Sequence, residues 1–285
     1  MIQYLYLGRI DYDQGLQLQA EIAELRHQGR VGNVLLLLEH PRVLTLGRNA
    51  NRSNVLASDE ILKQRGVILR EINRGGDVTY HGPGQLVGYP IFDLRSLRNH
   101  DGKRMGPVDF VRRMEEALIR LCGNFGLHAG RVAGLTGVWC PADGGPAETS
   151  GQERKIAAIG IHVARGITTH GFAFNVTTDL DDFTLINPCG ITDRAVTSLE
   201  NEIRLQRVER SEVLPSLESV AHQAARQFGK VFNEQVLAVE NLEALRAQAE
   251  AAPGAPRQFP AEDTPLQIPQ EIQRLRSPEG GPINA

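Results

Sequence analysis

Apolar residues along the chain follow two periods, one typical of strands and one of helices. The apolar run 33–39 ends at His40-Pro41, which indicates a buried strand that stops at a turn. Further strands are predicted over 86–92, 156–163 and 167–176, the last because branched and aromatic residues dominate it.

Helical spacing marks three other segments. A helix that begins just after Pro107 is predicted from one apolar face: Phe110, Met114, Leu118, Leu121 and Phe125. A second is predicted from Val213, Leu217, Val220, Ala224 and Phe228, and residues 13–28 predict a weaker one. Strands and helices do not alternate regularly, and short strands gather in 67–92 and 156–176. The pattern therefore favours an α+β fold with a mixed or mainly antiparallel sheet, flanked by helices, over a doubly wound fold.

Composition narrows the class of protein. The chain has 285 residues, and 31 basic against 34 acidic residues give a net charge of −3, so general attraction to nucleic acid is not expected. The apolar run 34–38 is far too short to cross a bilayer, and residues 1–13 do not resemble a signal peptide. Three cysteines do not make a disulfide framework. We expect a cytoplasmic protein without a membrane partner.

The C-terminal part differs in composition from the rest. Residues 251–285 contain seven of the fifteen prolines and a single aromatic residue, Phe259. We therefore expect one domain over 1–240, followed by an extension over 241–285 that is flexible from about residue 251.

The segment 74–85 (RGGDVTYHGPGQ) concentrates groups that bind ligands. Its four glycines and one proline are incompatible with the interior of a helix or a regular strand, and they let backbone N–H groups approach a ligand. Arg74, Thr79, His81 and Gln85 add donors suited to a carbonyl group. The alternative is a pair of turns with incidental polar residues. The segment matches neither a P-loop nor a dinucleotide fingerprint, so no nucleotide cofactor is expected.

A cysteine on a turn, Cys189, is the strongest candidate nucleophile. It lies in Asn187-Pro188-Cys189-Gly190, whereas Cys122 adjoins an apolar helical face and is expected in the core. A thiol at neutral pH needs a nearby cation or base to become a thiolate; the candidates are Lys155, His81, His162 and His170. Lys155 begins an apolar stretch and is either a solvated strand end or the partner of the thiolate. Spacing leaves both readings open, and it favours a solvent-facing His162.

Two further segments are less specific. Gly171 and Ala173 are small residues in an apolar strand, where they either leave room for a ligand or allow close packing against another backbone. Asp179, Asp181 and Asp182 are expected to form a solvated turn. No Cys-x-x-Cys or His-Glu-x-x-His pattern is present, so no metal site is predicted.

Over roughly residues 30–235 the chain resembles the octanoyltransferases of lipoate assembly, also called lipoyl(octanoyl) transferases. The resemblance depends on segments in the family's order: Glu39-His40-Pro41 with Thr45 and Gly47, the glycine-rich segment 74–85, Tyr89, Gly137-Val138-Trp139, 155–160, 170–176 and 186–190. The polar segment 140–153 is longer than the family's pattern, and the chain after about residue 240 exceeds the family core.

The resemblance implies a fold like the catalytic domain of biotin and lipoate ligases. It also implies octanoyl-acyl carrier protein as donor, and as acceptors the lipoyl domains of 2-oxo acid dehydrogenase complexes and the glycine cleavage H protein. Cys189 would carry the octanoyl group as a thioester, with its pKa lowered by Lys155, and no cofactor would be needed. The implied substrate contacts are Arg74, Gly75, Gly76, Asp77, Val78, Thr79, Tyr80, His81, Ala158, Ile159, Gly160, Gly171, Phe172 and Ala173.

Three alternatives remain open at this point. An ATP-dependent lipoate or biotin ligase of the same fold would need adenylate-binding residues and no cysteine nucleophile. A catalytically silent module that binds acyl carrier protein or lipoyl domains would not need both Cys189 and Lys155. A thioester hydrolase would release octanoate without an acceptor.

Overall fold

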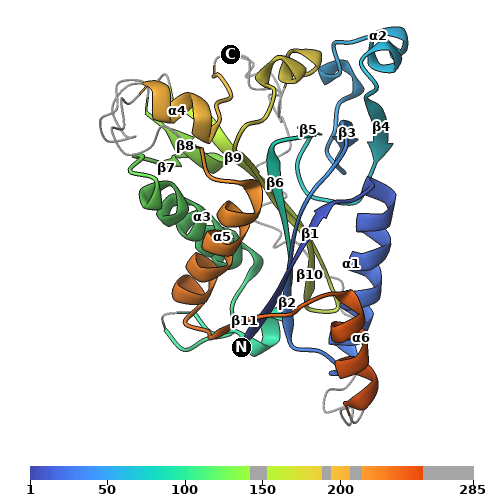
Figure 1. The fold of residues 1–285 in the computed structure, drawn as a ribbon, viewed down its shortest axis with the longest axis vertical. Helices are drawn as coiled ribbons and strands as arrows, with labels where there is room; N and C mark the ends of the chain where they lie inside the picture. The colour runs from blue at the N-terminus through green and yellow to red at the C-terminus, as the bar shows by residue number, and fades with distance from the viewer. Residues whose placement is uncertain (100, 142–152, 188–193, 206–213, 253–285) are drawn as a thin grey trace, which may run out of the picture. The chain divides into compact units, whose positions relative to one another are not determined.

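One mixed sheet contains most of the strands of the described chain. They are β1 (Ile2–Arg9), β2 (Asn33–Glu39), β6 (Gln85–Ile91), β7 (Gly130–Val132), β8 (Leu135–Cys140), β9 (Arg154–Ala164), β10 (Ile167–Asn175) and β11 (Val236–Ala238). Their order is β11-β1-β2-β6-β10-β9-β8-β7, with β1 parallel to β2 and β11 and the other pairs antiparallel (Figure 1). This computed structural model describes residues 1–99, 101–141, 153–187, 194–205 and 214–252. The predicted α+β fold with a mixed sheet is confirmed.

Helices cover both faces of this sheet. They are α1 (Tyr12–His27), α3 (Pro107–Asn124), α4 (Leu199–Leu205), α5 (Leu217–Phe232) and α6 (Leu242–Ala251), with the 3₁₀ turns η1 (Arg52–Asn54) and η2 (Leu94–Ser96) between elements. α3 and α5 lie on one face, and α1 and α6 on the other (Figure 1). The predicted apolar faces of α3 and α5 are buried in the core, and Val213, where the α5 pattern was predicted to begin, lies outside the described residues.

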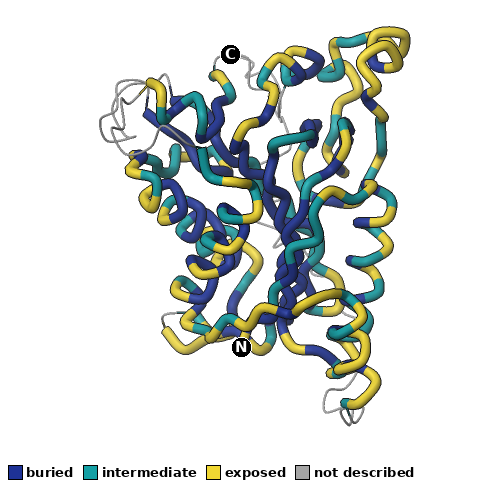
Figure 2. Tube along the Cα trace, viewed as in Figure 1, coloured by how far each residue is buried: buried dark blue, intermediate teal, exposed yellow. Residues whose placement is uncertain are grey.

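β2 shows why its sequence is apolar without interruption. Leu35 and Leu37 pack toward α3 and α5, whereas Val34, Leu36 and Leu38 pack toward α1 and α6. Alternate side chains thus enter different cores, and the strand is buried on both faces (Figure 2).

A smaller sheet carries part of the glycine-rich segment. Its strands β3 (Val43–Leu46), β4 (Ile68–Glu71) and β5 (Val78–His81) are ordered β4-β3-β5 and pack with α2 (Asp59–Gln64) and η3 (Leu180–Leu185). The expectation that 74–85 contains no regular strand is wrong for 78–81. There, four branched or aromatic-ring residues between the glycine pairs favour an extended backbone.

The C-terminal extension begins with α6. Leu245 and Ala249 of this helix are buried in the same core as α1. We keep the division near residue 240 as a proposal about where the catalytic domain ends. Within the described residues, no helix combines the length and apolar character needed to cross a membrane.

Candidate active site

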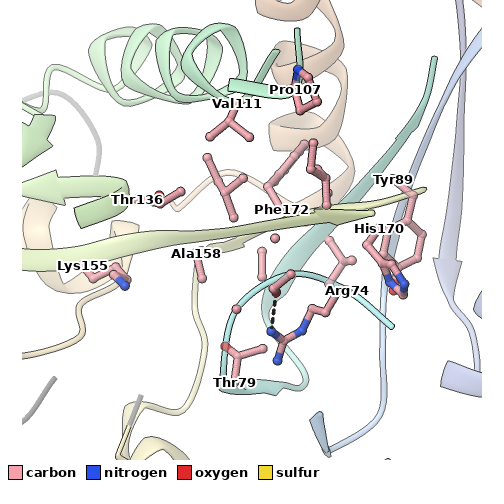
Figure 3. A pocket seen from close by; sticks show the side chains of 18 of the residues that line it. Arg74, Thr79, Tyr89, Pro107, Val111, Thr136, Lys155, Ala158, His170 and Phe172 are labelled. Carbon is pink, nitrogen blue, oxygen red and sulfur yellow. Dashed lines mark hydrogen bonds between the residues drawn. The ribbon is translucent and has the colours of Figure 1, made fainter. Parts of the chain in front are cut away.

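A cavity of about 500 Å³ lies against the face of β9 and β10. The glycine-rich loop bounds it on one side, and the start of α3 with the turn between β7 and β8 bounds it on the other (Figure 3). Lys155 lies toward one end, and Tyr89 and His170 lie toward the other. Thirteen of the residues named from the sequence line it: Arg74, Gly75, Gly76, Thr79, His81, Lys155, Ala158, Ile159, Gly160, His170, Gly171, Phe172 and Ala173.

Three other predicted contact residues do not line this cavity. Along β5, Thr79 and His81 face the cavity while Val78 and Tyr80 are buried in the core of the small sheet, as the alternation of a strand requires. Asp77 accepts hydrogen bonds from the backbone N–H of Asn51 (3.0 Å) and the side chain of Asn54. We infer that these three residues hold the loop in place instead of contacting substrate.

Asp182 corrects the expectation of a solvated aspartate turn. Its carboxylate is buried, accepts a hydrogen bond from the Tyr80 hydroxyl (2.6 Å) and pairs with Arg42 (2.8 Å) and Arg65 (3.4 Å). Burial alone raises the pKa of Asp182, but the hydrogen bonds from Tyr80 and Arg42 outweigh burial and lower it. Asp182 therefore anchors β5 through Tyr80.

The glycine-rich loop is docked onto β9 through its backbone. The N–H of Gly75 donates to the Ile161 carbonyl (3.0 Å), and a Cβ on Gly160 would come within 2.8 Å of the Gly75 oxygen. The guanidinium of Arg74 donates to the carbonyl (2.7 Å) and hydroxyl (2.9 Å) of Thr45. Glycine at these positions lets two backbone segments meet at the cavity wall.

Gly171 and Ala173 differ in why they are small. A Cβ on Gly171 would lie 2.1 Å from the Gly88 oxygen, so close packing against β6 requires glycine there. Ala173 pairs with Ala158 across the β9–β10 ladder, and both line the cavity. Close backbone packing therefore accounts for the glycine at 171, which also borders the cavity, and Ala173 leaves space beside the sheet.

The hydrogen-bond network fixes the tautomer of His81. Its Nδ1 lies 2.8 Å from Oε1 of Gln85, whose Nε2 donates to the Tyr80 carbonyl (3.1 Å) and to Asn175 Oδ1 (2.9 Å). An amide oxygen only accepts, so Nδ1 of His81 carries the proton and Nε2 keeps its lone pair. His81 is thus a neutral acceptor in the cavity wall.

Two other histidines border the same region. Nδ1 of His40 donates to the Ile10 carbonyl (2.8 Å), and its Nε2 accepts from the Tyr89 hydroxyl (2.7 Å). His170 lies 2.7 Å from Asn73 Oδ1 and has a φ of 56°. His162, expected in solvent, is partly buried instead, and its Nδ1 has no hydrogen-bond partner among the described residues.

These histidines make the fold sensitive to acid. Burial lowers the pKa of His40 to about 4, of His81 to about 3 and of His170 to about 4. In the unfolded chain the three histidines take up a proton near pH 6.5, whereas in the folded chain they stay neutral to about pH 4. The stability that the neutral histidines confer is therefore complete above pH 6.5 and is lost as pH falls toward 4. We expect the free energy of unfolding to fall by about 4 kcal/mol per pH unit near pH 5, because nearly three protons separate the two states there.

Denaturant unfolding over a pH series measures this slope. His170→Asn, which suits the positive φ, should reduce the slope by about a third because one of three protons is removed. Replacing the exposed His27 with asparagine is the matched control, because it changes a histidine outside this buried group. An undiminished slope in His170→Asn would count against the buried neutral histidines.

Lys155 is not a solvated strand end. The residue is 8% exposed, and Nζ lies 4.6 Å from the centroid of the Trp139 ring. The backbone N–H of Lys155 donates to the Ala195 carbonyl (2.9 Å), and the backbone carbonyl of Lys155 accepts from the N–H of Thr197 (2.9 Å). Lys155 is therefore held at the cavity wall by backbone pairing with residues 195–197.

Of the three cysteines, Cys189 lies outside the described residues. Cys122 and Cys140 are buried, and burial raises the pKa of both thiols above the ordinary range. The core position predicted for Cys122 is confirmed. Neither thiol lines the cavity, so neither is suited to act as a nucleophile there.

Several lining residues were not predicted from the sequence. They are Tyr12, Val87, Pro107, Val108, Val111, Arg112, Gly134, Leu135, Thr136 and Ile161, together with Tyr89, which only the family resemblance had included. Alternation of side chains along β6 would have placed Val87 on the same face of the strand as Tyr89. The residues of α3 and of the β7–β8 turn reach the site only through tertiary packing.

The mixed sheet and this cavity define a catalytic domain of the lipoyl protein ligase A/B type, whose sequence model matches residues 11–223. An octanoyltransferase of Acidobacterium capsulatum is 60% identical over 242 residues, which are 85% of this chain and 94% of the relative. An octanoyltransferase of Koribacter versatilis is 48% identical over 275 residues, or 96% and 97% of the two chains. The chain belongs to the octanoyltransferase family and is an acyltransferase of lipoate biosynthesis.

Solved structures share the fold at lower sequence identity. Lipoate-protein ligase A bound with ATP superposes with a TM-score of 0.60 at 20% identity, covering 88% of this chain and 93% of that one. A bipartite lipoate protein ligase of Thermoplasma acidophilum gives 0.59 at 19%, covering 88% and 91%. These likenesses concern the fold alone.

Proposed function

We propose that the protein transfers an octanoyl group from octanoyl-acyl carrier protein to a lysine of lipoyl domains through a thioester on Cys189. The acceptors are the lipoyl domains of 2-oxo acid dehydrogenase complexes and the glycine cleavage H protein, and the compartment is the cytoplasm, where free thiols stay reduced. The observation that carries the proposal is the buried Lys155 at the cavity wall. It pairs with Ala195, six positions after Cys189 in the sequence.

The first half-reaction exchanges one thioester for another. The Lys155 ammonium favours the thiolate of Cys189, which attacks the donor carbonyl. The carrier thiolate leaves and takes a proton from Lys155. Bond energies on the two sides are similar, so no ATP is needed.

The second half-reaction forms an amide. The amine of the acceptor lysine attacks the octanoyl carbonyl on Cys189, and the nitrogen gives a proton to the neutral Lys155. The Cys189 thiolate leaves, which restores the starting charge pair. Formation of an amide from a thioester drives this step.

A structural neighbour supports a lipoyl domain as the acceptor, and the lining of the cavity supports binding of an acyl chain. A structural neighbour from Thermoplasma acidophilum was solved as a ligase with its E2 lipoyl domain, which favours lipoyl domains as acceptors here. The cavity beside Lys155 is lined by Ala158, Ile159, Phe172 and Ala173, side chains suited to an alkyl chain.

An assay without ATP tests the proposal. Octanoyl-carrier protein and a lipoyl domain are mixed with the enzyme, and intact-protein mass spectrometry follows both proteins. We expect an octanoyl adduct on the enzyme, mapped to Cys189, and its transfer to the acceptor lysine. Cys189→Ala should lose both, whereas Cys140→Ala is the control that keeps the thioester.

Each alternative has its own outcome in this assay. Strict dependence on ATP would indicate a ligase. Binding without an adduct on the wild type would indicate a silent module, and octanoate released without acceptor would indicate a hydrolase. An undiminished adduct after Cys189→Ala would overturn the covalent mechanism.

A further inference from the structure

The segment Gly137-Val138-Trp139 of β8 lies against Lys155, and the reaction described above assigns it no role. We propose that Trp139 is a positioning residue that holds the side chain of Lys155 at the cavity wall as an ammonium ion. This inference rests on the proposed function of Lys155. It adds a residue that acts through Lys155 without contacting the substrate.

A β-bulge brings the two side chains together. Val138 pairs with Ala157 in the β8–β9 ladder, but the next pair is Trp139 with Lys155, so one residue of β9 is skipped. That residue, Ile156, is fully buried in the core. Without the bulge Trp139 would pair with Ile156, so the irregularity selects Lys155 as its partner.

Gly137 leaves space for the lysine stem. Its φ of 127° is one that L side chains rarely adopt, and a Cβ there would lie 2.6 Å from the Ala157 carbonyl and 3.5 Å from Cε of Lys155. Its N–H donates to the buried carboxylate of Glu115 (3.1 Å). The backbone of β8 is thus fixed where the lysine side chain passes.

The indole ring favours the charged form of the amine. Nζ lies 4.6 Å from the ring centroid, within the range of a cation–π contact, and tryptophan gives the strongest such contact. Trp139 is 1% exposed, so the contact is made away from bulk water. Arg194 also lies over this ring at 5.7 Å and pairs with Glu153.

Other charged and titratable groups surround Lys155. The charged and titratable groups of the described elements packed around Lys155 and its cavity include Tyr12, Arg74, His81, Tyr89, Arg112, Glu115, Arg131, Glu153, Arg154, His170, Arg194 and Glu202. The transition of interest lies between about pH 6 and pH 10, and burial raises the pKa of Tyr12 and of Tyr89 away from it. Both histidines are neutral above pH 6 because burial lowers their pKa. A transition in this range then reports Lys155 or the Cys189 thiol.

Holding the ammonium serves both half-reactions. Before acylation it keeps the positive charge beside the sulfur. After Lys155 has given its proton to the departing carrier thiolate, the ring disfavours the neutral amine and so promotes return of a proton from the acceptor lysine. Weaker ring contact should slow both steps.

The pH dependence of Cys189 alkylation tests this role. Iodoacetamide labelling is followed by peptide mass spectrometry in wild type, Trp139→Phe, Trp139→Tyr and Trp139→Leu. We expect Trp139→Leu to raise the apparent pKa of labelling by about one pH unit and to slow octanoyl transfer at pH 7 about tenfold. The two aromatic variants should recover part of both effects. A Trp139→Leu protein with wild-type circular dichroism and an unshifted labelling profile would overturn the inference.

Tryptophan fluorescence of proteins that keep Trp139 tests the inference if Trp139→Leu does not fold. Trp139 is the single tryptophan of the chain, so tryptophan emission reports the surroundings of this ring. In a Cys189→Ala background we expect one alkaline transition in emission, and Lys155→Met should abolish it. The same transition in both proteins would refute the contact. Failure of the proposed function is distinguishable, because the wild type would then form no octanoyl adduct on Cys189.

Discussion

Replacing Lys155 with methionine is expected to lower the single-turnover rate of octanoyl transfer by about a thousandfold. Methionine keeps a long apolar stem beside Trp139, so the cavity wall should persist. What is lost is the positive charge that favours the Cys189 thiolate and the group that exchanges protons in both half-reactions. Rapid-quench measurement of the octanoyl-enzyme and of the octanoylated lipoyl domain separates the two steps.

Lys103→Met is the matched control, since Lys103 is exposed and lies outside the cavity. It should transfer octanoyl at the wild-type rate. Lys155→Met activity within tenfold of wild type, with an intact fold, would remove Lys155 from the proposed chemistry.

Ala158→Phe is expected to block octanoyl loading by about a hundredfold or more while the chain still folds. Ala158 lies on β9 between Lys155 and Gly160, and its side chain faces the cavity (Figure 3). A phenyl ring there would occupy space that the alkyl chain needs. Because the residue borders an open cavity instead of the packed core, overpacking should be mild.

Ala247→Phe on the exposed face of α6 is the control for adding a phenyl group. Thermal unfolding should place both variants within a few degrees of wild type, and only Ala158→Phe should lose loading of octanoyl thioester. Wild-type loading by a folded Ala158→Phe would show that the acyl chain binds elsewhere.

The local sequence pattern was sufficient to predict an element where its apolar residues are all buried. The run 33–39 is β2, buried on both faces, and the stripe from Phe110 to Leu121 is the buried face of α3. β5 escaped prediction because the glycines on either side concealed four residues of strand character. The bulge between β8 and β9 depends on pairing between strands, so no local pattern could reveal it.

The candidate site was likewise predicted only in part from the sequence. Motifs identified the loop at Arg74 and the start of β9 at Lys155, but not which side chains face the ligand. Strand alternation turns Thr79 toward the cavity and Tyr80 toward the buried Asp182, whose ion pairs come from distant arginines. Such long-range pairing also decided that Lys155 is buried instead of solvated.

A crystal structure of the octanoylated protein tests the central claim most directly. The account predicts continuous electron density from Sγ of Cys189 into the cavity between the glycine-rich loop and β9, with Nζ of Lys155 at about hydrogen-bond distance from the sulfur. An acyl chain attached to another residue, or a sulfur far from Lys155 with the cavity empty, would contradict it.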